Sequence, residues 1–309
     1  MKIISLNKIF LLISLFLISI AFSNAANATC DKTGAAIQFT QDSATPVKDD
    51  GTAGDQCSDT PDAYKSKFYK LGLCTADTSS NDLSSCEYII NSSAGIEHII
   101  TYPTSGEISV PEFMINPGTY PYMVAVLSNK LGIKHSITTT TNVTGASGTG
   151  KFCWTSDAGP SAYTNEAVAT PHGTTIAGDG SDVLIECGTS AGTAIFSYEV
   201  INILSQEACS DGFDPANGDS QAMGSVGNGT ATVGLLQADD SFGTSCANAS
   251  KILWTTALTT PQVITVDSSY ELKLRTQNAV SVDFDNNEET NAVVKMGADP
   301  IQLYLTVTD

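Results

Sequence analysis

The sequence predicts an all-β fold, an antiparallel β-sandwich or jelly roll held together by disulfides after a signal peptide has been cleaved. Three observations predict it. Hydrophobic and polar residues alternate with a period of two through most of the chain, and no long segment follows the 3.6-residue period of a helix. Glycine, asparagine and proline separate the alternating segments at short intervals. Eight cysteines follow an N-terminus of the kind that directs export.

The N-terminus has the composition of a secretory signal. Two lysines flank the start of an apolar run of twelve residues, Ile9–Ile20, and the triplet Ala26-Asn27-Ala28 supplies small residues for cleavage. This run is too short to cross a bilayer. We therefore expect removal of residues 1–28, a mature chain that begins at Thr29, and no membrane insertion afterwards. The mature protein is expected to be secreted or at the cell surface, with the periplasm as the alternative compartment.

The alternation defines the expected strands. Most are short, as in sandwiches and jelly rolls, and one segment, Ala194–Gln206, also admits a helix. The expected strands are Ala35–Gln41, Tyr64–Cys74, Cys86–Ile90, Ile96–Tyr102, Thr119–Ser128, Ile133–Thr141, Val183–Cys187, Ala194–Ile203, Thr230–Leu236, Lys251–Thr256, Gln262–Val266, Tyr270–Arg275, Val280–Phe284, Ala292–Met296 and Ile301–Val307.

The sequence around Pro117-Gly118 predicts a turn that leads into a strand with alternating tyrosines. The segment Ile115–Tyr122 resembles the corner at which many extracellular β-sandwich domains pass from one sheet to the other. The resemblance covers few residues and implies a fold only. An immunoglobulin domain would place a cysteine two residues after its corner tyrosine, and this chain does not.

A segment rich in glycine, serine and threonine near the middle of the chain allows two organisations. Residues 141–150 (TNVTGASGTG) form either a linker or the end of a long hairpin. The corresponding division is 29–145 and 146–309, as two halves of one sandwich or as two sandwich domains.

The cysteines are interpreted as a disulfide framework. An even number of thiols in an exported chain indicates structural bridges, and the absence of a Cys-x-x-Cys motif removes the usual signature of zinc and redox sites. The simplest pairing is sequential, and each bridge contributes about 2–4 kcal/mol to stability. The expected pairs are Cys30–Cys57, Cys74–Cys86, Cys153–Cys187 and Cys209–Cys246.

The charge balance argues against two classes of partner. The chain has a formal net charge of −19, and loss of a leader with two lysines and no acidic residue makes it −21. Arg275 is its single arginine. Nucleic acids and anionic membranes both require clustered basic residues, so neither is expected as a partner.

The motifs that suggest hydrolysis are incomplete. Gly188-Thr-Ser190-Ala-Gly192 matches the nucleophile turn of α/β-hydrolases, but that fold places its histidine after the serine. His98, His135 and His172 all precede Ser190. Ser220 follows Gly218-Asp219, yet it lacks the glycines that come next in trypsin-like proteases. The sequence therefore predicts a protein that is not an enzyme, with a secreted serine hydrolase as the weakest alternative.

Calcium is the only cofactor that the sequence leaves open. Asp283, Asp285, Asn287 and Glu289 alternate oxygen ligands, as in a loop that wraps a hard cation. In so acidic a chain, a solvated acidic turn is the simpler interpretation. A monomeric carbohydrate- or calcium-binding module is consequently the first alternative function. Its candidate platforms for a sugar are Tyr120, Tyr122, Trp154 and Trp254, although core packing is the usual role of such side chains.

The C-terminal segment motivates the main functional hypothesis. Ile301, Leu303, Leu305 and Val307 lie on one face of a regular strand, and that face must be buried. The strand either closes its own domain or is donated to a neighbouring subunit. The sequence thus predicts an exported structural or adhesive surface protein, whose partner is another copy or another surface protein, as in a fibre subunit assembled by strand donation.

Overall fold

The computed structural model describes residues 29–38, 56–102, 115–145, 147–156, 160–162, 185–200, 221–226, 228–243, 248–284, 293–299 and 301–308. These residues form nineteen β-strands and no α-helix, which confirms the all-β prediction. Within them, no helix has the length and hydropathy needed to cross a membrane.

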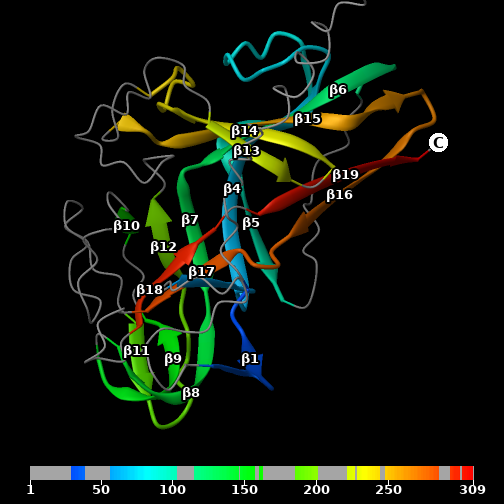
Figure 1. Cartoon of the computed structure of the whole chain (residues 1–309). Helices are drawn as coiled ribbons and strands as arrows, with labels where there is room; N and C mark the ends of the chain where they lie inside the picture. The colour runs from blue at the N-terminus through cyan, green and yellow to red at the C-terminus, as the bar shows by residue number, and fades with distance from the viewer. Residues whose placement is uncertain are drawn as a thin grey trace, which may run out of the picture.

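One large sheet organises the molecule (Figure 1). Strands β7 and β6 pair with successive parts of β4, so β5 occupies the other edge of β4. In spatial order the nine strands are β10 (Pro160–Ala162), β12 (Ser197–Val200), β7 (Lys130–Lys134), β4 (Ala63–Cys74), β6 (Gly118–Ser128), β15 (Lys251–Ile264), β14 (Gly229–Leu236) and β13 (Gln221–Val226), with β5 (Cys86–Thr101) beside β4.

Three smaller sheets accompany it. The five-stranded sheet contains β1 (Lys32–Thr33), β2 (Ala36–Ile37), β8 (Ser136–Thr144), β9 (Thr149–Thr155) and β11 (Ile185–Gly188). The three-stranded sheet contains β18 (Val293–Ala298), β17 (Val280–Phe284) and β3 (Gln56–Asp59), and the two-stranded sheet contains β16 (Ser269–Arg275) and β19 (Gln302–Thr308). All strand pairs are antiparallel except β10–β12 and β2–β8.

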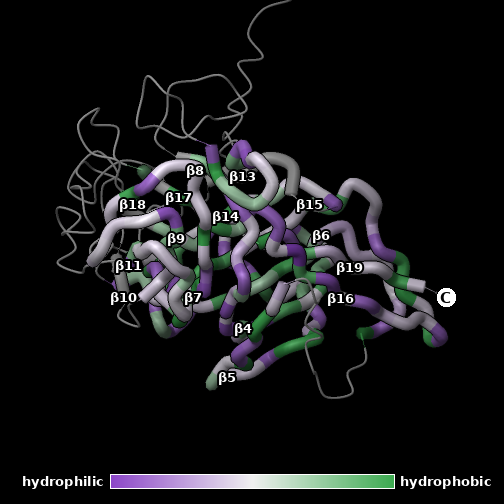
Figure 2. The backbone as a smooth tube through the Cα atoms, turned by 90° about the horizontal axis from the view of Figure 1, so that it is seen from below, coloured by the Kyte–Doolittle hydropathy of each residue, from purple (hydrophilic) through white to green (hydrophobic). Residues whose placement is uncertain are grey.

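The large sheet buries apolar side chains on both faces. Along β6, Met123, Ala125 and Leu127 contact the main core, whereas Val124 and Val126 contact a second, smaller cluster. This follows from the period of two, since successive side chains of a strand point to opposite faces. In Figure 2 the same alternation appears along β4, where hydrophobic and hydrophilic positions follow each other. The three-stranded and two-stranded sheets contribute side chains to the main core, so they pack against the face of the large sheet that carries Met123, Ala125 and Leu127.

Three predicted disulfides are present. They join Cys30 to Cys57, Cys74 to Cys86, and Cys153 to Cys187. Cys74–Cys86 and Cys153–Cys187 link directly paired positions of adjacent strands. Cys209 and Cys246 lie outside the described residues.

Strand β6 begins at Gly118, directly after the proline of the predicted turn. Tyr120 is buried, and its hydroxyl donates a hydrogen bond of 2.8 Å to the backbone oxygen of Asn116. This bond fixes the turn at Pro117-Gly118 against the start of β6.

Strand boundaries differ from the sequence expectation at three places. A single expected strand, Ile133–Thr141, is divided at His135 into β7 and β8, which belong to different sheets. Two strands expected at Cys86–Ile90 and Ile96–Tyr102 form the single strand β5, and those expected at Lys251–Thr256 and Gln262–Val266 form the single strand β15. Five strands were not expected from the sequence, because most of them are brief or carry little alternation: β1, β3, β9, β10 and β13.

The glycine-rich segment in the middle of the chain forms a hairpin end. Val143 pairs with Gly150 and Thr144 with Thr149, so residues 141–150 connect β8 directly to β9. Strands from both sides of residue 145 pair with each other, as β12 does with β7 and β15 with β6. The segment Ala194–Gln206, where a helix was the alternative, contains strand β12 in its described part.

Candidate functional site

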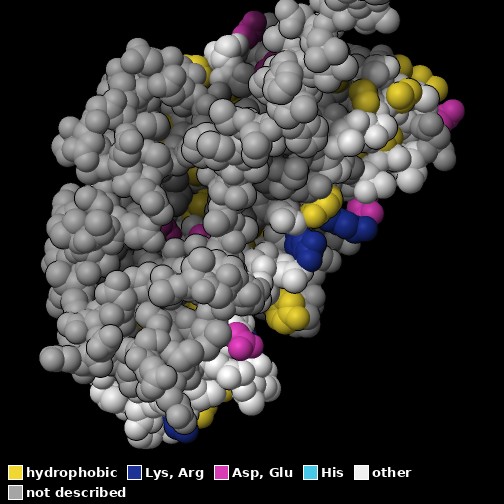
Figure 3. Space-filling model, in the orientation of Figure 1, with side chains coloured by type: hydrophobic (Ala, Val, Ile, Leu, Met, Phe, Trp, Pro, Cys, Tyr) yellow, Lys and Arg dark blue, Asp and Glu magenta, His cyan; other side chains and the backbone are white. Residues whose placement is uncertain are grey.

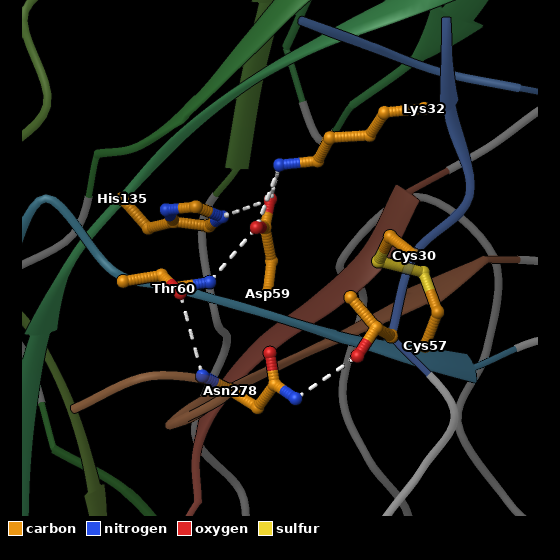
Figure 4. A network of polar contacts seen from close by, with 8 residues as sticks. Cys30, Lys32, Cys57, Asp59, Thr60, His135 and Asn278 are labelled. Atoms are coloured by element: carbon orange, nitrogen blue, oxygen red, sulfur yellow. Dashed lines mark hydrogen bonds and ion pairs between the residues drawn. A yellow bond between two sulfur atoms is a disulfide. The ribbon is translucent and has the colours of Figure 1, made fainter. Parts of the chain in front are cut away.

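A buried ionic cluster lies where three sheets meet (Figure 4). Asp59 ends β3 of the three-stranded sheet, and Lys32 belongs to β1 of the five-stranded sheet. His135 occupies the single position between β7 and β8, where the chain passes from the nine-stranded to the five-stranded sheet. We call Lys32, Asp59 and His135 the junction cluster. Its position implies that it helps hold the sheets together.

The Asp59 carboxylate contacts both Lys32 and His135. Lys32 Nζ lies 2.6 and 2.7 Å from the two carboxylate oxygens, and the backbone nitrogen of Thr60 donates to Oδ1 at 2.8 Å. His135 Nε2 lies 3.4 Å from Oδ2, an ion-pair distance. The Asp59 side chain is only 10% exposed. The carboxylate is therefore desolvated but surrounded by positive or donor groups.

The surrounding backbone keeps this cluster in place. The Cys30–Cys57 disulfide lies beside it and ties the N-terminal segment to β3. Asn278 donates from its backbone to Thr60 Oγ1 and from its side chain to Thr29 Oγ1. His135 is anchored by its backbone, which exchanges two hydrogen bonds with Thr155 of β9. The junction cluster is thus positioned by rigid elements and one covalent bridge.

The surroundings of Asp59 lower the pKa of its carboxyl. Burial alone would raise the pKa of the carboxyl, but His135 and Lys32 oppose this and lower the pKa of Asp59 to about 2. Neither ring nitrogen of His135 has a hydrogen-bond partner in the described part of the chain. A Ser–His or Cys–His catalytic site needs a nucleophile bonded to the imidazole, and no described serine or cysteine is bonded to His135. The geometry fits an ion pair that stabilises the junction.

A second aspartate, Asp240, lies between two lysine side chains. Asp240 Oδ1 lies 2.5 Å from Lys251 Nζ, and Oδ2 lies 2.8 Å from Lys70 Nζ. Burial raises the pKa of Asp240, but the hydrogen bonds from Lys251 and Lys70 outweigh it, so the pKa is lowered. Its side chain is 28% exposed, which places this cluster closer to water than the junction cluster.

The Gly188–Gly192 segment, which matches the hydrolase motif, forms a loop that packs on Trp154. Ser190 is exposed in the loop after β11, and the described residues that follow lead to strand β12 without the helix of a nucleophile turn. A side chain at Gly192 would overlap the Trp154 indole, with Cβ only 2.2 Å from a ring carbon. The loop therefore packs on Trp154. His172 and Ser220 lie outside the described residues.

His98 lies in β5, a strand that pairs with β4 alone, and its side chain is buried because its face of the strand is turned toward the interior. Two of the four aromatic residues considered as sugar platforms, Tyr120 and Trp254, are buried and pack in the main core. The Trp254 indole nitrogen donates to Thr256 Oγ1 at 3.0 Å, so its polar atom is satisfied internally.

The calcium prediction lies mostly outside the described residues. Asp283 belongs to β17, where its backbone pairs with Gln56 and Lys295, while Asp285, Asn287 and Glu289 are not described. In the part of the chain that is described, no three His, Cys, Asp or Glu side chains are grouped as a metal would require. The calcium site stays a prediction.

The C-terminal strand closes against its own chain on one edge. Seven residues of β19 pair with β16, from Gln302–Arg275 to Thr308–Ser269. Ile301 and Leu303 are buried in the main core, and Val307 packs partly against it. No described strand pairs with the outer edge of either β16 or β19. Among the described strands, β16 and β19 therefore pair only with each other.

Comparison with known proteins gave no match to a family model, to a curated protein or to a solved structure. The function must therefore be inferred from the geometry of the described residues.

Proposed function

We propose that this protein is an exported structural or adhesive component of the cell surface whose copies associate through the C-terminal strand β19. The proposal includes a cleaved leader, residues 1–28, and a sandwich-like or jelly-roll core stabilised by disulfides. The observation that carries it is the two-stranded sheet of β16 and β19, in which no described strand pairs with the outer edges.

A sheet edge of this kind favours pairing with another chain. Unpaired N–H and C=O groups along a strand can accept an additional strand, and natural proteins usually protect such edges. An isolated two-stranded sheet is also marginally stable in water, so addition of strands stabilises it. Strand addition would thus satisfy backbone groups and extend the sheet across a subunit boundary.

The end of this sheet is also apolar. Val266 is 85% exposed in the turn between β15 and β16, and Val263 of β15 is 57% exposed. In Figure 3, hydrophobic side chains gather at the upper right, over the end of the molecule where β6 and β15 project in Figure 1. Exposed apolar groups beside an open strand edge would be covered in an assembly.

The proposal predicts assembly that depends on this end of the molecule. Oxidised mature protein, residues 29–309, should form ordered oligomers or filaments in light scattering and negative-stain images. Deleting residues 301–309 should abolish them, because β19 is removed. Since this deletion also removes buried Ile301 and Leu303, a milder variant is needed. Val263→Lys with Val266→Lys should keep the fold and still prevent assembly, because both side chains are exposed.

The matched control is Tyr102→Lys with Ile195→Lys, which places two lysines at other exposed apolar positions. This variant should assemble like the wild type. A wild-type protein that stays monomeric at all concentrations would contradict the proposal, as would assembly by the Val263→Lys, Val266→Lys variant. Repeating the series with calcium separates the alternative, because a monomer whose melting temperature rises with calcium indicates a binding module.

A further inference from the structure

The outer face of the nine-stranded sheet concentrates lysines and aromatic rings. In β4, Lys65 and Lys67 alternate with buried Tyr64, Ser66 and Phe68, so the two lysines share the face opposite the main core. We define the lysine–aromatic face as Lys65, Lys67, Tyr69 and Lys70 of β4, Lys130 and Gly132 of β7, Phe196 and Tyr198 at β12, and Lys251 of β15.

Strand register places these residues side by side. Tyr198 pairs with Gly132, and Gly132 pairs with Lys65 in the next strand. Because directly paired residues lie on the same face, this row crosses three strands. A side chain at Gly132 would approach the Tyr198 ring to 2.9 Å, so the ring lies over the glycine. The missing side chain lets the tyrosine pack on the sheet.

Every cation–π contact among the described residues lies on this face. Lys65 Nζ is 5.1 Å from the centre of the Phe196 ring and 5.7 Å from that of Tyr198, and Lys130 Nζ is 4.4 Å from the latter. Lys67 and Lys251 lie 5.5 and 4.7 Å from the Tyr69 ring. The rings therefore gather ammonium groups on one surface of a chain whose net charge is −19.

The described carboxylates neutralise only part of this charge. Lys65 pairs with Glu97 at 3.2 Å, and Asp240 binds both Lys70 and Lys251. Lys67 and Lys130 contact a ring, but no described carboxylate lies within ion-pair distance of either. Burial lowers the pKa of Lys65, yet the Tyr198 hydroxyl and Glu97 outweigh it and raise the pKa. The face thus carries five charged lysines against two acids.

We propose that the lysine–aromatic face binds a linear anionic polysaccharide. The lysines are spread over neighbouring strands, which suits the dispersed carboxylates or sulfates of a polymer. Lysine acts as a point charge and does not need the fixed bidentate geometry of arginine. Phe196 and Tyr198 add half-buried apolar surface beside the charges, against which sugar rings can lie.

Charge favours a thin polymer over a second copy of the protein as the occupant. A Debye length of about 8 Å at physiological salt screens the remaining acidic surface from a polymer lying along this face. Two copies that docked face to face here would instead bring their lysines together, and these like charges repel. The face is distinct from the β16–β19 sheet, so this inference does not depend on the proposed self-association.

Binding is tested with polygalacturonate and heparin as anionic probes, dextran as a neutral probe and single-stranded DNA as a polyanion of another class. Mature oxidised protein is titrated in microscale thermophoresis at several salt concentrations. We expect at least one anionic glycan to bind, more weakly as salt increases, and dextran not to bind. Lys67→Glu with Lys130→Glu should weaken binding by about tenfold or more.

The matched control is Lys151→Glu with Lys273→Glu, which changes net charge equally at exposed positions outside the face. The control should bind within about twofold of the wild type, since Lys151 and Lys273 belong to β9 and β16 and not to the strands of the face. Three outcomes would overturn the proposal: no binding of either glycan by the wild type, equal losses in both double variants, or equally tight binding of DNA. Circular dichroism of each variant verifies that the fold is kept.

Discussion

Asp59 and Asp240 are alike in chemistry and differ in surroundings. Each carboxylate lies between two basic side chains, and in each case these partners overcome the effect of burial and lower the pKa of the aspartate. Asp59 is 10% exposed at a junction of three sheets, whereas Asp240 is 28% exposed in the turn after β14. Water and salt reach Asp240 more easily, so its ion pairs are screened more strongly.

This difference in exposure indicates that the two aspartates have different roles. At the junction, loss of the charge would leave Lys32 and His135 without their common partner inside the fold. At Asp240, the same loss would release Lys70 and Lys251 toward solvent on the lysine–aromatic face. One aspartate is therefore expected to matter chiefly for stability, and the other chiefly for the charge of a surface.

The largest effect is expected from Asp59→Asn. Removing one partner from a buried ion pair leaves the remaining charge uncompensated, and we expect a loss of about 2–3 kcal/mol in the free energy of unfolding. Urea denaturation of oxidised protein at neutral pH measures it. Asp62→Asn, an exposed aspartate three residues away, is the matched control and should change stability by less than about 0.5 kcal/mol. Equal stability of the two variants would contradict a stabilising role for the junction cluster.

The pH dependence sharpens the same comparison. The pKa of Asp59 is about 2 in the folded protein, below the unfolded value of about 3.9. A lowered folded pKa stabilises the protein above the unfolded value, and the contribution is lost as pH falls from about 4 through about 2. The stability difference between wild type and Asp59→Asn should therefore be about 2 kcal/mol at pH 6 and should shrink toward zero near pH 2. A difference that stays constant over this range would contradict the assignment.

The smallest effect on stability is expected from Asp240→Asn. Partly exposed ion pairs contribute roughly 0–1 kcal/mol, so we expect a loss below about 1 kcal/mol that diminishes in high salt. Binding of the anionic glycan should instead become tighter, because two lysines lose their carboxylate. A large loss of stability would show that this cluster acts like the junction cluster.

Much of the fold follows from local patterns. Alternation defined β4, β6, β14, β16 and β19 to within a residue or two, because each has one face in a core. Sequential pairing of cysteines was correct for the three described bridges, since each joins segments that are close in the chain. Patterns of this kind are local, and a single sequence displays them.

The junction cluster and the lysine–aromatic face could not be predicted from local patterns in the same way. Lys32, Asp59 and His135 come from three distant segments, and only the arrangement of the sheets brings them together. One signal for the junction was present: His135 interrupts an otherwise regular alternating segment. One signal for the surface was present too, since Lys65, Lys67 and Tyr69 occupy every second position of a strand and must share a face unless a bulge intervenes.

The most direct test of the central claim is hydrogen–deuterium exchange of β19 at low and high protein concentration. If copies associate through this strand, backbone amides of residues 302–308 should gain protection as concentration rises. Amides of β13, an edge strand of the nine-stranded sheet, should exchange at the same rate in both samples. Unchanged exchange in β19, either in a protein that stays monomeric or in one that assembles with protection elsewhere, would contradict assembly through the C-terminal strand.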